Sequence, residues 1–576
     1  MSGSFKIRSA LPYLLSGAVV LYLTFGGIYY EGALDTVIQT YVYGLFSGGS
    51  NAMPDTFGLF VLLSTPLNFL YRLFPTINWY DCFQAIILGA CVCWLIKTLI
   101  LYEKHENLTS LFLGALFFIT IVSRILQPVE LTKTAMLVAA ISLIEVYRAK
   151  TFARYSLFGI FFLVALLMRV ESGLLVFAIV APFFFMDVTA TGGSYKGWVQ
   201  KTIFLSLLVG SVSLLVNIPK TPEEEYYLKI RAYEYSLTDF DREQAVVKLQ
   251  NREDSVIFRS CVNFFFADSS RCNLAFFNKI GLLQFDKTPG SMVGRLQSIS
   301  IPHTKWHSFI EVLKAVKWLL LILLCLLIQI SASKFYSVRI LIANLYALAL
   351  MCFISLWLKP EEHVVAPALA ALILVNLIWI RQHPHNTSRA LNLFITIAAI
   401  GFISKEMYGQ FHRMKHQRDE NAYYNYVCNY LQLHNAENYL LNIGSWDEAH
   451  HKMFAQNNFA GLPKAYVIDG AILYFNGGYQ KLMKNTTGST KFIDQWQYFI
   501  DRKGSVFVSS EKRMAMLLEY MNVVYHQNYK AQRILQFNPA DESQQKKALG
   551  LFVVRQMPID TANTNTTNAR LTQEKI

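Results

Sequence analysis

Long runs of apolar residues between Ala10 and Ile403 restrict what this chain can fold into more than any other feature. A run of about 18 residues or more, wound into a helix, can cross a hydrocarbon core of about 30 Å. Only 16% of the 576 residues are charged, against roughly 25% in soluble globular proteins. The pattern predicts an α-helical polytopic membrane protein. It excludes a disordered chain, a collagen and an ordinary cytosolic enzyme.

We expect about 10–12 transmembrane or re-entrant helices in a transmembrane domain at 1–404. The first apolar run, Leu11 to Tyr30, is expected to stay as an anchor because no small-residue cleavage pattern follows it. Polar outer loops are expected at 31–79 and 219–307. The predicted spans are 10–30, 80–101, 107–126, 131–147, 155–186, 201–218, 308–332, 336–357, 363–381 and 389–403.

Basic residues of the short loops set the expected orientation. Lys6 and Arg8 precede the first span, and three more basic residues lie at 148–154, so both groups are expected in the cytoplasm. An even number of crossings must then separate them, and 56–75 is expected to lie in the outer interface as an amphipathic or re-entrant helix. The net charge of +13 fits such loops, and nothing in the sequence indicates a nucleic-acid partner.

The segment 155–186 is too long for one crossing, since its 32 residues would span about 48 Å as a single helix. We expect two short, re-entrant or tilted crossings that turn at 168–173, because a single crossing would invert every later loop against the positive-inside rule. The N-terminus is then cytoplasmic. The turn, both large loops and the C-terminal domain face the extracytoplasmic side.

The C-terminal region has the pattern of a soluble extracytoplasmic α/β domain at 405–560, followed by a disordered tail at 561–576. Helix-like patterns cover 417–434, 445–457, 492–502 and 511–525. Strand-like runs cover Tyr439–Ile443, Val506–Ser509 and Leu549–Arg555. Of the eight cysteines, Cys261 and Cys272 share one polar loop, where they form either a disulfide in an oxidising compartment or two unpaired thiols.

Glu31 and Asp35 follow the first span at a helical i, i+4 spacing, which places both carboxylates on one helix face. Two acids at a membrane surface can raise one another's pKa, a usable arrangement for a general base. The alternative is a solvated helix end with ordinary acidic residues.

The order of these features resembles the GT-C glycosyltransferase superfamily. The resemblance rests on an outer loop that opens with YYEGALDT, a second span that begins with WY, the segments RILQPVELTKTA and MRVES, and a soluble domain after the last span. It implies transfer of a sugar from a polyprenyl-phosphate donor to a glycan, lipid or protein acceptor, with Asp35 or Glu31 as general base. The loop has no adjacent Asp-Asp or Asp-Glu pair, so both acids stay candidates.

Cations near the predicted outer surface are candidates for binding the donor phosphate. Arg169, supported by Glu171, would be expensive in lipid and should face protein or water; its alternative role is an ion pair with Glu171 that stabilises the turn. Lys359 and His363 begin a span on the same side, or form a plain polar boundary. Arg124 and Glu130 could shape a substrate groove or simply solvate a loop.

Metal-binding patterns are weak, and no cofactor or metal is firmly indicated. Asp239 and Asp241 have DxD spacing, and His303 with His307 and the segment 447–451 contain ligand types, but none forms a recognised metal motif. GxGxxG, the Walker motif and GxSxG are absent, which disfavours a nucleotide-powered pump and an α/β-hydrolase.

Two non-catalytic functions compete with the enzyme. One is a transporter or flippase of lipid-linked saccharide, which should show hydropathy repeats that this sequence lacks. The other is an accessory subunit of an envelope complex, whose C-terminal domain docks a partner.

Overall fold

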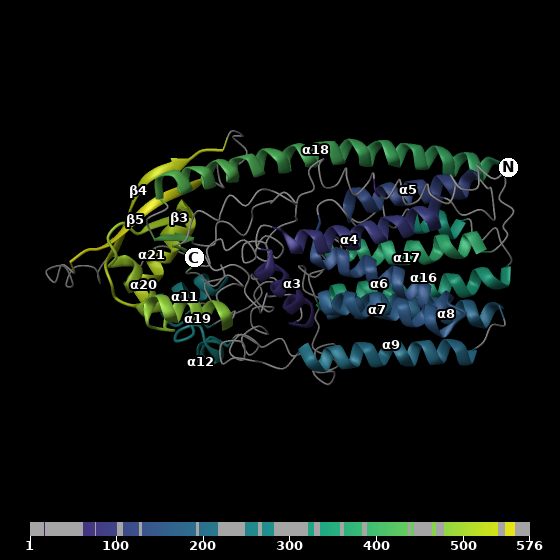
Figure 1. Ribbon diagram of the computed structural model, residues 1–576, viewed down its shortest axis with the longest axis horizontal. Helices are drawn as coiled ribbons and strands as arrows, with labels where there is room; N and C mark the ends of the chain where they lie inside the picture. The colour runs from purple at the N-terminus through teal and green to yellow at the C-terminus, as the bar shows by residue number, and fades with distance from the viewer. Residues whose placement is uncertain are drawn as a thin grey trace.

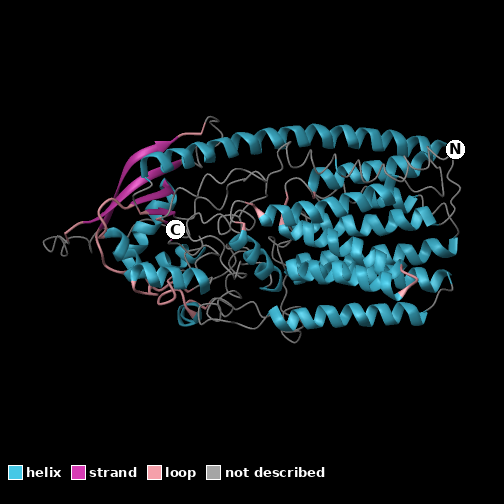
Figure 2. Ribbon diagram, in the orientation of Figure 1, coloured by secondary structure: helices cyan, strands magenta, loops and turns pink. Residues whose placement is uncertain are grey.

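The computed structural model describes Gly17 and residues 61–74, 77–100, 108–125, 129–191, 195–216, 248–262, 268–281, 321–327, 334–357, 362–382, 389–435, 439–442, 464–467, 477–539 and 548–558. Apolar helices pack side by side in a bundle, and a small sheet with short helices lies beyond one end of it (Figure 1). Figure 2 shows the strands gathered at that end, whereas the rest of the described chain is mainly helical. The predicted first span, apart from Gly17, the predicted helix at 445–457 and the tail at 561–576 lie outside the described residues.

Two helices form the centre of the bundle. Every residue of α6 from Leu131 to Tyr147 is buried, and so is every residue of α17 from Val365 to Ile380. A helix that is mainly apolar and buried on all sides lies in the interior of a helix bundle. The surrounding helices are α4 (Trp79–Leu95), α5 (Leu108–Arg124), α7 (Phe152–Met168), α8 (Val170–Thr191), α9 (Tyr195–Val216) and α16 (Lys334–Trp357), with α6 (Leu131–Arg148) and α17 (Glu362–Gln382) inside them.

Two helical stretches among the described residues, Trp79–Leu99 and Tyr195–Leu215, have the length and composition of a membrane span. The first combines α4 with a π-helical turn, Ile96–Ile100. It starts where the sequence predicts, because the Asn78 side chain accepts a hydrogen bond from the backbone of Asp81 and caps the helix. Shorter apolar helices cover Phe152–Met168, Val170–Met186, Val338–Ile354 and Val364–Ile380.

The chain reverses direction between α7 and α8, at the turn that the sequence predicts at 168–173. Arg169 has an extended backbone between the two helices. The ring centroids of Phe162 in α7 and Phe177 in α8 are 6.3 Å apart. The ring of Phe184 stacks on the ring of Tyr147 at the far end of α6. A Cβ atom on Gly173 would lie 2.6 Å from a methyl carbon of Leu166, so a larger residue would require the Leu166 side chain to shift.

Helix α3 (Val61–Leu73) packs against α4 and α7 at the bundle end nearest the sheet (Figure 1). Its burial pattern is mixed: the polar Ser64 and Asn68 are buried together with Tyr71, whereas Leu62 and Phe69 are each about 60% exposed. The helix falls within the segment that the sequence predicts to lie in the outer interface. Its 13 residues are too few for a crossing.

The C-terminal sheet has five strands in the order β2-β1-β3-β5-β4. The first three strands of this order are parallel, and the last two join antiparallel. Trp496 is fully buried beneath the sheet, within 6 Å of the rings of Phe507 and Tyr529. The strands are β1 (Leu440–Asn442), β2 (Ala465–Val467), β3 (Val506–Ser510), β4 (Tyr529–Phe537) and β5 (Leu549–Gln556), and the helices are α19 (Gly477–Thr487), α20 (Phe492–Ile500) and α21 (Glu511–Val524).

Helix α18 (Arg389–Asn435) crosses the expected domain border. It runs unbroken for 47 residues, so the expected border near residue 405 lies inside one helix that passes from the bundle to the sheet (Figure 1). Its first half packs against α5, and its last turns enter the core of the C-terminal domain. Arg124, at the end of α5, contacts Glu406 in the middle of α18, which places the start of α6 at the bundle end that faces the domain.

Part of the predicted outer loop 219–307 also belongs to the C-terminal domain. Helices α11 (Arg252–Val262) and α12 (Leu274–Lys279) contribute Ile257, Phe277 and both cysteines to the same core as Trp496. The domain is therefore assembled from two distant stretches of chain, and these must lie on the same side of any membrane that the bundle crosses.

Candidate functional site

The structure describes only part of the predicted site. Asp35, Glu31 and Lys359 lie outside the described residues, and of His363 only the backbone, in the first turn of α17, is described. The weak metal-binding patterns at 239–241, 303–307 and 447–451 also lie outside them. Within the part of the chain that is described, no group of three or more histidine, cysteine or acidic side chains could hold a metal ion.

Arg169 lies at the helix reversal, with its side chain directed toward the start of α6. Its Nη1 donates a hydrogen bond to Oγ1 of Thr132 over 2.5 Å. The predicted alternative, an ion pair with Glu171, is not among the described ion pairs, and the Glu171 side chain is exposed at the first turn of α8. Arg169 is partly exposed, so its other guanidinium nitrogens can bind a ligand at this end of the bundle.

The first turn of α6 places further polar groups beside Arg169. Glu130 precedes the helix in an extended conformation and is 5% exposed, while Thr132 and Lys133 are 1% and 3% exposed. A buried lysine and a guanidinium at the N-terminus of a helix, where the backbone dipole is positive, create a local potential that favours an anion such as phosphate. Glu130 and the exposed Glu171 offset this charge, so the Arg169 guanidinium and the helix N-terminus are the groups that favour an anion here.

Lys133 was not predicted as a site residue, although the sequence contains the signal. It is a lysine inside the apolar span 131–147, and the rule that singled out Arg169, that ionisable residues within a span are costly and functional, applies to it equally.

Arg124 forms an ion pair that links two helices. Its Nε and Nη2 donate to the two carboxylate oxygens of Glu406 at 2.8 and 3.3 Å, a bidentate pair that joins α5 to α18. Arg413 adds a longer contact of 3.9 Å to the same carboxylate. Glu406 is 5% exposed, and a carboxylate so deeply buried needs this guanidinium. Arg124 therefore holds the long helix in place at the edge of the candidate site.

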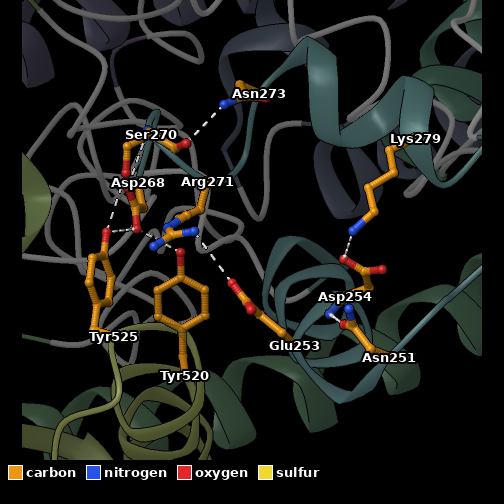
Figure 3. A network of polar contacts seen from close by, with 10 residues as sticks. All are labelled: Asn251, Glu253, Asp254, Asp268, Ser270, Arg271, Asn273, Lys279, Tyr520 and Tyr525. Atoms are coloured by element: carbon orange, nitrogen blue, oxygen red, sulfur yellow. Dashed lines mark hydrogen bonds and ion pairs between the residues drawn. The ribbon is translucent and has the colours of Figure 1, made fainter.

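A second polar cluster joins the loop segment 248–281 to the domain (Figure 3). Asp268 is buried and accepts hydrogen bonds from the hydroxyls of Tyr520, at 2.7 Å, and Tyr525, both on or just after α21. Burial, together with the negative charge of Asp268, raises the pKa of both tyrosines, so they stay protonated and continue to donate. Ser270 donates a further bond to Asp268 at 2.6 Å.

The outer side of this cluster is held by charge. Lys279 of α12 lies 2.6 Å from the buried carboxylate of Asp254 in α11, and Arg271 reaches Glu253 at 3.4 Å while its guanidinium lies over the ring of Tyr525. Figure 3 shows these side chains converging from α11, α12 and α21. The arrangement fixes the loop segment on the domain, and both of these cations are already paired with carboxylates rather than left to bind a substrate.

Comparisons with known protein families, with curated proteins and with solved structures found no match for this chain. The function is therefore argued from the sequence and the geometry alone.

Proposed function

We propose that this chain is a GT-C-like multi-pass membrane glycosyltransferase, which moves a sugar from a polyprenyl-phosphate donor to an acceptor on the extracytoplasmic side. The observation that supports it most is the placement of Arg169 beside the polar first turn of α6, at the bundle end that faces the C-terminal domain. A lipid-linked phosphate that enters from the bilayer would meet the Arg169 guanidinium there, and an acceptor held by the domain could reach it.

The exposed outer surface of the bundle supports a membrane setting. Large apolar side chains on the outer faces of its helices are exposed, among them Ile86, Leu207 and Ile397 at 72%, 65% and 61%. Water would make such a surface strongly unfavourable, at roughly 25 cal/mol for each Å² of apolar area. Lipid removes that cost, and helices shorter than the two candidate spans also fit a bilayer that thins locally around them.

The basic residues support the proposed sidedness. Arg148, Lys150 and Arg154 lie at the end of α6 opposite Arg169, and Lys201 of α9 donates to the carbonyl oxygens of Tyr147 and Ala149 at 2.8 and 2.6 Å. This end would be cytoplasmic by the positive-inside rule. Arg169, α3 and the C-terminal domain would then share the extracytoplasmic side, as the reaction requires.

In the proposed reaction, Asp35 or Glu31 takes the proton of the acceptor hydroxyl as its oxygen bonds to the anomeric carbon of the sugar. The bond from that carbon to the phosphate oxygen breaks, and the electron pair leaves with the polyprenyl phosphate. Arg169, with Lys359 and His363, would bind the phosphate and stabilise its growing charge. Lys133 is added to this group because it is buried in the same turn as Thr132.

The test is transfer by the purified full chain in lipid nanodiscs with a polyprenyl-phosphate sugar as donor. We expect Arg169→Ala to lower turnover by about 100-fold or more, the usual cost of removing one charged contact to a developing anion. Arg169→Lys should recover only part of the activity, because an ammonium cannot bind phosphate bidentately.

Lys150→Ala is the control, since it removes an exposed cation near the opposite end of α7. It should leave turnover near the wild-type level in protein that retains its melting temperature. Equal activity of wild type and Arg169→Ala would overturn the assignment of the phosphate site. Donor binding without any turnover, in wild type as well, would favour a transporter or an accessory subunit.

A further inference from the structure

Two cysteines in the loop segment lie in direct contact. Cys261 is near the end of α11, and Cys272 comes two residues before the first residue of α12. Their Sγ atoms are 3.0 Å apart, which is within about 1 Å of the S–S bond length. Both side chains are buried, at 1% and 0% exposure, in the core of the C-terminal domain.

The surroundings of this pair leave it little freedom to separate. Asp268, between the two cysteines in sequence, is fixed by the hydroxyls of Tyr520 and Tyr525 and by Ser270 (Figure 3). The backbone N–H of Cys272 donates to the carbonyl oxygen of Asp268 at 2.8 Å. The turn before α12 is therefore held against α21 at the position where Cys272 meets Cys261.

A third cysteine in the same core provides a comparison. Cys428 of α18 is equally buried, at 1% exposure, but no cysteine is its neighbour among the described contacts. Burial raises the pKa of Cys428, as expected of a thiol that packs as a small apolar group. Burial alone therefore does not distinguish the Cys261 and Cys272 pair; their contact does.

We propose that Cys261 and Cys272 form a disulfide in the mature protein, which joins the end of α11 to the turn before α12 within the loop segment 248–281. The proposal rests on the extracytoplasmic placement of that domain under the proposed function, because disulfides persist in oxidising compartments. It names a covalent link within a segment that packs on the domain through Ile257 and Phe277 and through hydrogen bonds and ion pairs.

The oxidant is a protein or small-molecule disulfide. One cysteine thiolate attacks a sulfur of that disulfide, which gives a mixed disulfide and releases one thiolate. The second cysteine thiolate attacks the mixed disulfide, forms the Cys261–Cys272 bond and releases the other thiolate. Two cysteine thiols lose two protons and two electrons, and the oxidant is reduced to two thiols.

The exchange must precede complete packing of the domain. The contact with Cys261 and burial both raise the pKa of Cys272, so the thiolate that reacts is disfavoured once α11 and α12 are in place. The same burial shields the finished bond from reductants in solution. We therefore expect the bond to resist reduction in the folded protein and to become reducible on unfolding.

Differential alkylation of the purified full chain tests the proposal. Free thiols are blocked with iodoacetamide during denaturation without reductant, and the remaining cysteines are then reduced and labelled with N-ethylmaleimide before mass spectrometry of peptides. We expect Cys261 and Cys272 to carry the second label and Cys428 the first. Recovery of Cys261 and Cys272 with the first label would overturn the proposal.

Single variants identify the pairing. In Cys261→Ser, Cys272 should move to the first label, and the converse should hold for Cys272→Ser, whereas Cys428→Ser should change neither. Second-label Cys272 in the Cys261→Ser variant would mean another partner and contradict the pair. These labels are read without any transfer assay, so an inactive protein with the bond, or an active one without it, separates this proposal from the proposed reaction.

Discussion

Helix α9 of the bundle and helix α21 of the C-terminal domain bury a similar face and differ on the opposite one. Both direct apolar residues inward: α9 buries Leu205 and Val209, and α21 buries Leu517. On the outer face α9 exposes leucines and isoleucine, whereas α21 exposes Glu511 and Lys512. A helix in water needs only one apolar face. The difference teaches that the two regions are built for different surroundings.

Polar groups show the same contrast in the interior. In the bundle they pair with one another, as Asn344 of α16 and Asn376 of α17 do through two reciprocal amide hydrogen bonds of 3.0 and 2.8 Å. In the domain, tyrosine hydroxyls bridge to the backbone or to Asp268, and most charged pairs are exposed. Where no water is available, each buried polar group must find a protein partner.

The largest effect should come from breaking a buried ion pair in the bundle. Arg124→Ala leaves the carboxylate of Glu406 buried without its bidentate partner, and we expect a loss of about 3–5 kcal/mol in stability, seen as a lower melting temperature in nanodiscs. Arg533→Ala in the domain removes an exposed pair with Glu511 and should cost less than about 1 kcal/mol.

The double variant Arg124→Ala/Glu406→Ala sharpens this comparison. It removes the stranded charge, and it should recover part of the melting temperature that Arg124→Ala loses. If Arg124→Ala and Arg533→Ala lowered the melting temperature equally, the bundle interior would not be the dry environment that the contrast requires.

Local patterns in the sequence predicted much of this fold, and contacts between distant residues account for what they missed. Strands β1, β3 and β5 and the turn at Arg169 follow from apolar runs and from the length of 155–186. Strand β4 was missed because it is a sheet edge, and most of its residues are exposed and polar rather than alternating. The polar stretch after residue 404 predicts the end of a helix, but its residues are good helix formers and α18 continues through it.

The same limit applies to the candidate site: local sequence patterns predict single residues, whereas contacts between distant residues are missed. Arg169 could be predicted, because a charged residue inside an apolar run stands out by composition. Its partner Thr132 could not, and neither could the contacts of Arg124 with Glu406 or of Asp268 with Tyr520, because each joins residues far apart in sequence. Spacing rules describe neighbours along one helix, whereas these contacts depend on how the helices pack.

A change of intermediate size in stability, which depends on pH, is expected where α18 meets the sheet. The Tyr423 hydroxyl donates to the carbonyl oxygen of Phe537 and accepts from the N–H of Leu549, both at 2.8 Å. Burial raises its pKa from 10.0 to about 12. The folded state then holds the proton more tightly than the unfolded state. The contribution of Tyr423 to stability is therefore fully present below pH 10 and falls as the pH rises toward 12.

Tyr423→Phe should cost about 1–2 kcal/mol at pH 7 through the lost hydrogen bonds, and it should make the alkaline decline less steep. Melting temperatures of the domain across this pH range measure both effects. Tyr426→Phe, an exposed tyrosine on the same helix, is the control and should match wild type. Parallel alkaline declines for wild type and Tyr423→Phe would mean that this hydroxyl does not titrate on unfolding.

The smallest effect on stability, and the most direct test of the contrast, comes from two exposed leucines. Leu207 in the middle of α9 is 65% exposed, and Leu433 near the end of α18 is 80% exposed. Leu207→Cys and Leu433→Cys should each change stability by less than about 0.5 kcal/mol, since neither side chain is in a core. A membrane-impermeant maleimide applied to the protein in nanodiscs should rapidly label the thiol introduced by Leu433→Cys and leave the thiol introduced by Leu207→Cys unlabelled.

Both side chains lie mostly outside the protein, so only the identity of the surrounding medium can separate the reactivity of the two thiols. The wild-type protein measures the background from the eight native cysteines. Labelling of both introduced thiols at one rate would place α9 in water, and its apolar outer face would then need a protein partner instead of lipid. Protection of Leu207→Cys alone would mean that α9 is embedded in the bilayer, the condition under which the Arg169 site can receive a lipid-linked donor.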